Sequence, residues 1–220
     1  FGQLQHLTKL SMSFSEFFAN QARKPSGFFG RFIMSSIFNI GNSFLNKLTL
    51  EALSINSDDR VLDIGCGTGM LVRNIAKSTD ADYIEGVDFS NAMVSLAQKK
   101  NRSFIKNGRV KIVEGDFNTI PYQNSSFSKI CSVNTIYFWK EPEITTKKIA
   151  GLLNPGGKLL ISFEDIYQLE KRDLNKDVFQ LYTTEQVKDL LTECGFNDDV
   201  RIITQNQGDL KFHCVVGTKA

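Results

Sequence analysis

A glycine-rich segment near residue 65 has the residue types of a ligand-binding loop. It reads VLDIGCGTG over Val61–Gly69, so an apolar run leads into three glycines, and a helical pattern follows at once. Glycines let the backbone approach a ligand closely, and a helix that begins there presents unpaired N–H groups. Taken alone, the motif is equally expected of a tight strand–helix turn that binds nothing.

The spacing of the glycines argues against a pyrophosphate site. A dinucleotide-binding turn follows G-x-G-x-x-G, whereas the third glycine here, Gly69, comes one position early. Asp63, two residues before the loop, would repel phosphate and would suit a cationic amine. A nicotinamide-dependent oxidoreductase is therefore disfavoured, and it remains the alternative at the level of the fold.

A second acid is placed to bind a sugar. Asp88 lies at the end of the next apolar run, 21 residues after Gly67. A carboxylate about 20 residues beyond the glycine loop can accept hydrogen bonds from ribose hydroxyls. Capping of the following helix is the alternative role for Asp88, but Ser90 or Asn91 is better placed for it.

A third acid follows another apolar run. Asp116 offers a carboxylate for an exocyclic amine, and Phe117 offers a flat apolar surface for a purine. A Gly-Asp turn means little by itself. The position of Asp116 matters because the carboxyl ends of parallel strands meet at one edge of a sheet, where ligands bind.

The surrounding runs alternate between strand and helix patterns. Strands are expected at 60–64, 83–87, 110–113, 127–133, 158–163, 201–204 and 212–216, and helices at 70–78, 91–100, 143–153 and 184–194. A turn at Asn154–Gly157 should end the third helix, and Thr183 or Thr184 should cap the last one. The pattern predicts a doubly wound, Rossmann-like α/β fold with a seven-stranded, mostly parallel sheet and an antiparallel terminal strand pair.

Four motifs in this order resemble the class I S-adenosylmethionine-dependent methyltransferases. They are Val61–Gly69, Gly86–Ser90, Gly115–Phe117 and Leu152–Leu159, within a resemblance that spans residues 58–163. The chain is most similar to the small-molecule branch that includes ubiquinone- and menaquinone-biosynthesis methyltransferases. The resemblance implies S-adenosyl-L-methionine as cofactor, S-adenosyl-L-homocysteine as product and a small or lipid-like acceptor.

The resemblance also assigns residues to the cofactor. They are Asp63, Gly65, Cys66 and Gly67 for the methionine and ribose portion, Asp88 for the ribose hydroxyls, Phe89, Met93, Asp116 and Phe117 for the adenine, and Asn134 for the amino-acid end. Cys66 is common at its position in the family, so no redox chemistry is expected of it.

No catalytic residue is assigned, because in-line methyl transfer from a sulfonium mainly needs alignment of the reactants. Tyr137 is a candidate for the acceptor side, although it or Trp139 equally suits a cap on the core. Glu164 and Asp165, after the fifth expected strand, are further strand-end candidates, and they equally suit a solvated loop. His213 is expected to be structural and away from the active edge.

Composition restricts the partners. The chain has 220 residues, 41% of them hydrophobic and 23% charged, and a net charge of +2, which gives no reason to expect nucleic acid. No base-handling Asn-Pro-Pro-Tyr-like motif stands at 134–137. The four cysteines lack metal-ligand spacing, so we expect no metal, a reducing compartment and a cytoplasmic location.

Residues 1–50 are expected to form a helical extension before the cofactor-binding domain at 51–220. Apolar residues recur at helical spacing from Phe28 to Leu48, but Arg31 and several polar residues interrupt them, so the stretch fails as a membrane span. We favour the interpretation that these helices pack on the sheet. The alternatives are a lid over the acceptor or a surface that touches a membrane. His6 could reach the pocket only if the segment folded over it as a lid. A non-catalytic cofactor-binding partner or regulator is the alternative function.

Overall fold

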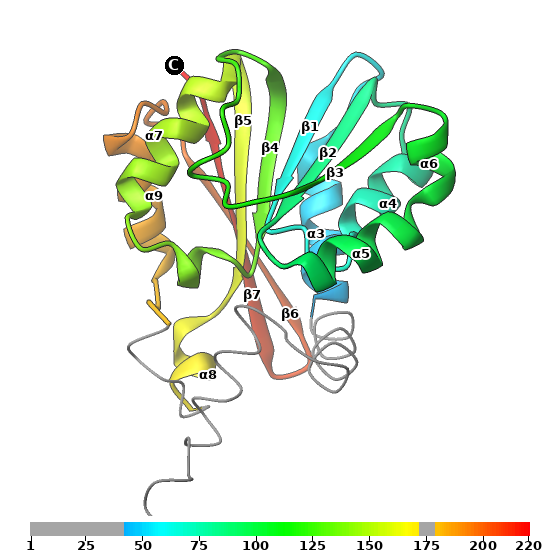
Figure 1. Ribbon diagram of the computed structural model, residues 1–220. Helices are drawn as coiled ribbons and strands as arrows, with labels where there is room; N and C mark the ends of the chain where they lie inside the picture. Colours follow the sequence, from blue (N-terminus) through cyan, green and yellow to red (C-terminus); the bar gives the residue numbers. More distant parts are fainter. Residues whose placement is uncertain (1–41, 172–178) are drawn as a thin grey trace, which may run out of the picture.

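A computed structural model describes residues 42–171 and 179–220 (Figure 1). The expected extension up to residue 41, with His6, lies outside the described residues. Within them, seven strands form one sheet in the order β3-β2-β1-β4-β5-β7-β6. The strands are β1 (Arg60–Ile64), β2 (Tyr83–Asp88), β3 (Val110–Glu114), β4 (Phe127–Val133), β5 (Leu153–Glu164), β6 (Arg201–Gln207) and β7 (Leu210–Thr218).

The strand directions confirm the expected fold class. β1 pairs parallel with β2 and β4, and the parallel pairing continues to β3 on one side and to β5 on the other. β7 pairs antiparallel with both β5 and β6, which is the terminal pair. The sheet is therefore mixed, and the five parallel strands all end at one edge.

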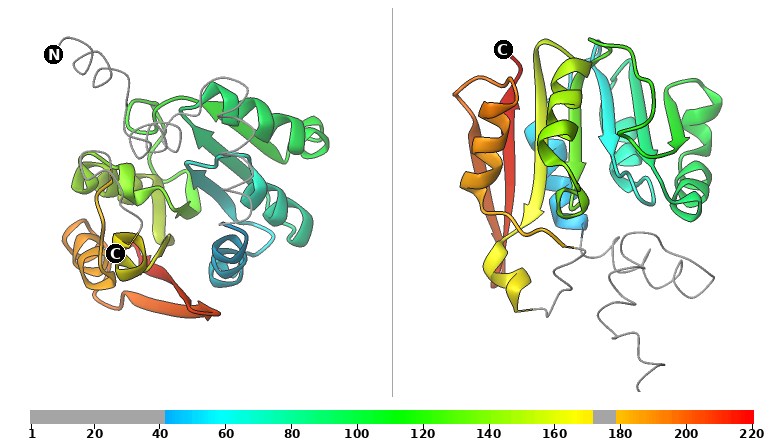
Figure 2. Two further views of the ribbon diagram at one scale, coloured as in Figure 1. Left: turned by 90° about the horizontal axis from the view of Figure 1, so that it is seen from below. Right: turned by 60° about the vertical axis from the view of Figure 1, so that its left-hand side comes forward.

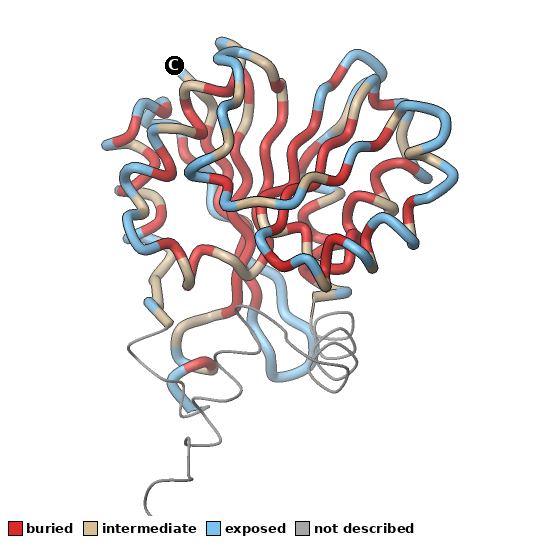
Figure 3. Tube along the Cα trace, viewed as in Figure 1, coloured by how far each residue is buried: buried red, intermediate tan, exposed pale blue. Residues whose placement is uncertain are grey.

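Helices cover both faces of this sheet (Figure 2). They are α3 (Ser43–Leu53), α4 (Met70–Ser78), α5 (Asn91–Lys100), α6 (Arg102–Lys106), the 3₁₀ helix η1 (Ile136–Phe138), α7 (Pro142–Leu152), α8 (Ile166–Glu170) and α9 (Thr184–Glu193). One core cluster joins the sheet to α3, α4 and α5, and the other joins it to α7 and α9. Burial runs along the central strands, whereas the edge strand β6 is largely exposed (Figure 3).

Helix α3 packs on the sheet through its apolar stripe. Leu45, Leu48 and Leu53 are buried, and the Phe44 ring lies 5.0 Å from the Phe212 ring of β7. Thr49 is fixed from the same side, because its hydroxyl is 2.7 Å from the Ser162 hydroxyl on β5. The described end of the N-terminal segment thus forms part of the core.

The turn expected at 154–157 takes a different form. α7 ends at Leu152 and β5 begins at once at Leu153, so the turn residues fall within the strand. Two steps along β4, from Phe127 to Lys129, face five steps along β5, from Leu153 to Lys158, and the extra residues bulge out of the ladder. The bulge is fixed to the end of the chain, since the N–H of Gly156 donates to the Lys219 carbonyl at 3.2 Å.

Candidate functional site

The glycine turn after β1 is attached to the end of β2. The N–H groups of Gly65 and Cys66 both donate to the Val87 carbonyl, at 2.8 and 3.0 Å. Burial raises the pKa of the Cys66 thiol well above its usual range, so the thiol stays protonated. Its sulfur packs so closely that a Cβ on Gly86 would lie 2.9 Å from it, which explains the need for glycine in β2.

Three glycines in the turn have positive φ, and each faces a different environment. A Cβ on Gly65 (φ 71°) would lie 2.4 Å from Thr135 Cγ2, and one on Gly69 (φ 69°) would lie 2.8 Å from Ala97 Cβ of α5. Nothing lies within 4 Å of the Cβ position of Gly67 (φ 52°). The turn therefore packs tightly at its two ends and leaves its middle open to a ligand.

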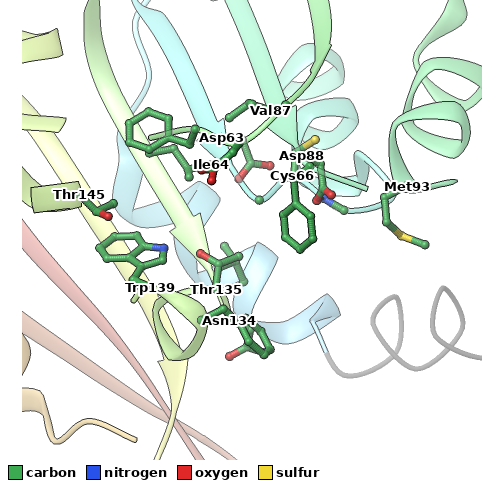
Figure 4. Close-up of a pocket in the computed structure, with 18 of the residues that line it drawn as sticks. Asp63, Ile64, Cys66, Val87, Asp88, Met93, Asn134, Thr135, Trp139 and Thr145 are labelled. Carbon is green, nitrogen blue, oxygen red and sulfur yellow. The ribbon is translucent and has the colours of Figure 1, made fainter. Parts of the chain in front are cut away.

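A cavity of about 540 Å³ opens at this edge of the sheet (Figure 4). Its size lies in the usual range for small-molecule sites. All ten residues that the resemblance assigns to the cofactor line it: Asp63, Gly65, Cys66, Gly67, Asp88, Phe89, Met93, Asp116, Phe117 and Asn134. Figure 4 shows Trp139 and Thr145 at one side of the cavity and Met93 at the other, with Asp63 and Asp88 between them.

Asp88 joins two loops through its carboxylate. One oxygen accepts from the N–H of Gly67 at 2.9 Å, and the other accepts from the N–H of Ser90 at 2.8 Å. Ser90 is the N-cap residue of α5, but its own side chain makes no capping bond. Part of the capping role thus falls to Asp88, while its carboxylate keeps lone pairs for a ligand, since two oxygens can accept about four hydrogen bonds.

Asp63 is 2% exposed and has an unusual protonation equilibrium. Burial, and then the negative charge of Asp88, raises the pKa of its carboxyl to about 7, while a hydrogen bond from the Cys131 thiol opposes the rise. Burial also raises the pKa of Asp88, and the N–H groups of Ser90 and Gly67 oppose this shift. A cation in the cavity would favour the charged forms of both carboxyls.

The loop after β3 is held from α7. Lys148 donates to the carbonyls of Phe117, Ile120 and Asn118 at 2.6, 2.7 and 3.1 Å, and its ammonium lies 4.9 Å from the centre of the Phe117 ring. Asp116 accepts from the N–H of Asn118 at 2.9 Å. Asp116 and Phe117, two of the residues expected at the adenine, therefore sit on a loop whose shape depends on Lys148, a residue that no sequence pattern singles out.

Asn134 lies at the end of β4 in a left-handed conformation, with φ of 53°. Its amide nitrogen donates to the side-chain oxygen of Asn42 at 2.6 Å, and its oxygen accepts from the Tyr137 hydroxyl at 3.1 Å. Tyr137 is 5% exposed, accepts from the Glu164 N–H at 2.8 Å and is not among the residues that line the cavity. The structure therefore places Tyr137 behind Asn134, where it supports that residue from the core.

The other strand-end candidates also lie outside the cavity lining. Asp165 caps α8, and its carboxylate is 3.0 Å from Nε2 of His213. The expectation that His213 lies away from the active edge is wrong. β7 runs antiparallel, so His213 pairs with Phe163, one residue before the carboxyl end of β5. Its Nδ1 is 2.9 Å from the Thr204 hydroxyl, and these contacts tie α8 to the β6–β7 hairpin.

Several cavity residues were missed by reasoning from the sequence. Asn42, the residue before α3, and Asn46 within it line the cavity, as do Phe138 of η1, Trp139 and Thr145 of α7. Helical spacing could have placed the two asparagines on one face, since they are four residues apart. Trp139, which by its position in the sequence equally suits a cap on the core, is 7% exposed and lines the cavity.

The cavity has an acidic lining in the described part of the chain. Four acids line it, Asp63, Asp88, Asp116 and Glu141, against one base, the exposed Lys140. Such a lining attracts a cation and repels an anion. Among residues 42–171 and 179–220, no cluster of three or more His, Cys, Asp or Glu side chains is placed to hold a metal ion. None of the helices described is long and apolar enough to cross a bilayer.

Comparisons with known proteins agree with this geometry. Residues 61–157 match the family described as a methyltransferase domain. The chain is 28% identical over 157 residues to the uncharacterized methyltransferase YdaC of Bacillus subtilis, a match that covers 71% of this chain and 82% of that protein. It is 29% identical over 160 residues to an O-methyltransferase of Pyrenophora dematioidea, and there it covers 68% of this chain but only 60% of the relative.

A solved structure has the same fold. Phosphoethanolamine N-methyltransferase 2 of Haemonchus contortus, in complex with S-adenosyl-L-methionine, superimposes with a TM-score of 0.74. The superposition covers 96% of this chain and 61% of that one, at 20% sequence identity. At this identity the likeness concerns the fold, and the ligand belongs to the other protein.

Proposed function

Since the chain belongs to the class I S-adenosylmethionine-dependent methyltransferases, we propose that it transfers the methyl group of S-adenosyl-L-methionine to a small or lipid-like acceptor in this cavity. The observation that carries the proposal is the meeting of three strand ends at one cavity. Asp63 is the penultimate residue of β1, Asp88 ends β2 and Asp116 follows β3, and all three line the cavity.

The residues present fit an adenosyl cofactor. The open space at Gly67 lets a ligand approach the backbone, as a cradle for a sugar or a methionine chain requires. Asp88 would hold the ribose hydroxyls, and Asp116 would accept from the adenine amine beside the apolar faces of Phe89 and Phe117. The acidic lining suits a positively charged ligand.

The cofactor, when bound, supplies a methyl group attached to a sulfonium, whose neutral thioether is a good leaving group. The chain's own task is then to hold the acceptor in line and to keep water out, and alignment can lower a barrier by roughly 7–11 kcal/mol in favourable cases. Phe138 and Trp139 give the cavity an aromatic wall beside α7. That wall favours a largely apolar acceptor. The acceptor should not be an anion, because the lining has few positive groups to offset the cost of burying a negative charge.

The name of the Pyrenophora relative, an O-methyltransferase, makes oxygen the first acceptor atom to test. The experiment incubates the full chain with S-adenosyl-L-methionine and a panel of phenols, hydroxyquinones, carboxylates and phosphates, and measures S-adenosyl-L-homocysteine by mass spectrometry. Turnover with neutral phenolic or quinonoid acceptors supports the proposal. Preference for phosphorylated or carboxylated acceptors would contradict the assigned acceptor class.

A parallel titration by calorimetry separates the cofactor classes. We expect binding of S-adenosyl-L-methionine and S-adenosyl-L-homocysteine and none of NADH, because Asp63 and the glycine spacing disfavour a pyrophosphate. Binding of NADH in preference to S-adenosyl-L-homocysteine would overturn the proposed cofactor.

A further inference from the structure

Asn46 is a mostly buried residue whose side-chain amide lines the cavity and is not hydrogen-bonded by the core. It lies in the second turn of α3 with 6% of its surface exposed. No hydrogen bond of its side chain is found within residues 42–171 and 179–220. Among the described residues, the fully enclosed side-chain atoms without a hydrogen bond are Asn101 Oδ1 and Thr146 Oγ1, so the amide of Asn46 is not sealed in the core. It reaches the cavity, where a ligand can pair with it.

The neighbouring polar side chain on the same helix provides the contrast. The hydroxyl of Thr49 donates to the Leu45 carbonyl at 2.7 Å and lies 2.7 Å from the Ser162 hydroxyl. Thr49 is therefore satisfied by the protein and does not line the cavity. Asn46 differs because its side chain faces the cavity instead of the sheet.

The place of Asn46 within the cavity is fixed by Asn42. The two asparagines are one helical turn apart, and the N–H of Asn46 donates to the Asn42 carbonyl at 2.7 Å. The side chain of Asn42 accepts from Asn134 at 2.6 Å, so the start of α3 lies against the end of β4. Asn46 therefore belongs to the part of the cavity near β4, on the far side of β1 from the ribose acid Asp88 on β2.

The chemistry of that corner suits a zwitterion. The adenosine side of the cavity is lined by Asp88 and Asp116, which would repel a carboxylate. An amide carries no charge, donates two N–H groups to a carboxylate and accepts from an ammonium through its oxygen. Asn46 can thus bind a carboxylate without opposing a nearby sulfonium.

We propose that the side chain of Asn46 binds the amino-acid end of the cofactor, as a binding residue on α3 that completes the site formed by the strand ends. This inference rests on the proposed function. It explains why α3, which is not one of the strand-end loops, presents an amide to the cavity. It also means that α3, which precedes the glycine turn in the chain, helps to bind the methionine portion of the cofactor.

The test compares two ligands that differ only at this end. S-adenosyl-L-homocysteine carries the amino acid, and 5′-methylthioadenosine carries the adenosine and the sulfur without it. The variants are Asn46→Leu, which removes the amide, and Asn46→Asp, which places a charge against the carboxylate. Thr49→Val is the matched control on the same helix, and calorimetry and a melting curve are recorded for each protein.

We expect the Kd of S-adenosyl-L-homocysteine to rise about tenfold in Asn46→Leu and more in Asn46→Asp, since hydrogen bonds to charged groups are the strong ones. The Kd of 5′-methylthioadenosine should stay within about twofold, since no bond to the amino-acid end is lost. Thr49→Val should lower the melting temperature and leave both affinities unchanged.

Three results decide the matter. Equal weakening of both ligands, or weakening of neither, in a protein whose wild type binds S-adenosyl-L-homocysteine overturns the role of Asn46 and leaves the proposed function standing. A wild type that binds neither ligand overturns both. Selective loss of S-adenosyl-L-homocysteine supports both.

Discussion

The carboxylate of Asp88 accepts a hydrogen bond from the backbone N–H of Gly67 at 2.9 Å, and this bond ties the end of β2 to the middle of the glycine turn after β1. The same carboxylate accepts from Ser90 at the start of α5. One acid thus shapes the loop that a cofactor would touch and also faces the cavity. The site is prearranged by the groups that would bind the ligand.

Asp63 should make cofactor binding depend on pH. Its pKa of about 7 means that it is partly protonated at neutral pH, and a cationic ligand favours the ionised form. Binding of S-adenosyl-L-methionine should therefore release a proton and strengthen as the pH rises from about 6 to about 8. Calorimetry in buffers of different ionisation enthalpy measures the release, which Asp63→Asn should lose.

Asp63 should also make the stability of the folded protein depend on pH. Because the folded-state pKa of Asp63 lies above its usual value of 3.8, the folded protein holds a proton that the unfolded chain has lost. The stability that this proton contributes is complete below about pH 4 and is lost as the pH rises through about 7. Asp63→Asn should raise the melting temperature relative to wild type at pH 8 and not at pH 4. An equal effect at both pH values would show that Asp63 is not buried as a neutral acid.

Lys148 should control the adenine side of the site. Lys148→Met keeps most of the length of the side chain but removes three hydrogen bonds that hold the loop at 117–120. The loop then loses part of its fixed shape, and the affinity for adenosine should fall about fivefold, as a penalty of ~1 kcal/mol implies. Lys147→Met, at the exposed neighbouring position, is the control. Calorimetry with adenosine measures the change. Unaltered affinity in Lys148→Met would show that the loop keeps its shape without the lysine.

Trp139 is the chain's single tryptophan and lines the cavity, so its fluorescence reports on this site alone. We expect S-adenosyl-L-homocysteine to change the emission with the same Kd that calorimetry gives. Trp139→Phe should retain the affinity for S-adenosyl-L-homocysteine within about twofold and lower kcat/KM for the acceptor about tenfold, because the indole N–H and part of the aromatic wall are lost. If calorimetry detected binding of S-adenosyl-L-homocysteine and the Trp139 emission did not change, the ligand would bind outside this cavity.

Local patterns were enough to predict most of the fold and the strand-end side of the site. Apolar periodicity and the glycine turn gave the strands, the helix α4 and the places of Asp88 and Asp116. Thr183 caps α9 with the reciprocal Gln186 bonds of a capping box, as its residue type indicated. These features depend on neighbours in the chain, which a single sequence records.

The features that were missed depend on tertiary contacts. Asn42 and Asn46 interrupt an apolar pattern, and only the packing of α3 against β4 and β5 turns them toward the cavity. His213 reached the active edge because its strand runs antiparallel, which reverses the edge at which a residue lies. The turn at 154–157 became a bulge because Lys219, far along the chain, pairs with it.

The proposed function depends on the carboxylate of Asp88, which should hold the ribose of an adenosyl ligand. This role is tested by titrating adenosine and 2′-deoxyadenosine into the wild type, Asp88→Ala and the control Glu114→Gln, an exposed acid at the same edge of the sheet. The wild type and the control should prefer adenosine about tenfold or more, as a lost hydrogen bond to a charged group implies, and Asp88→Ala should bind both ligands weakly and alike. If Asp88→Ala kept the preference of the wild type for adenosine, the carboxylate would not hold the sugar, and the proposed cofactor site would be wrong.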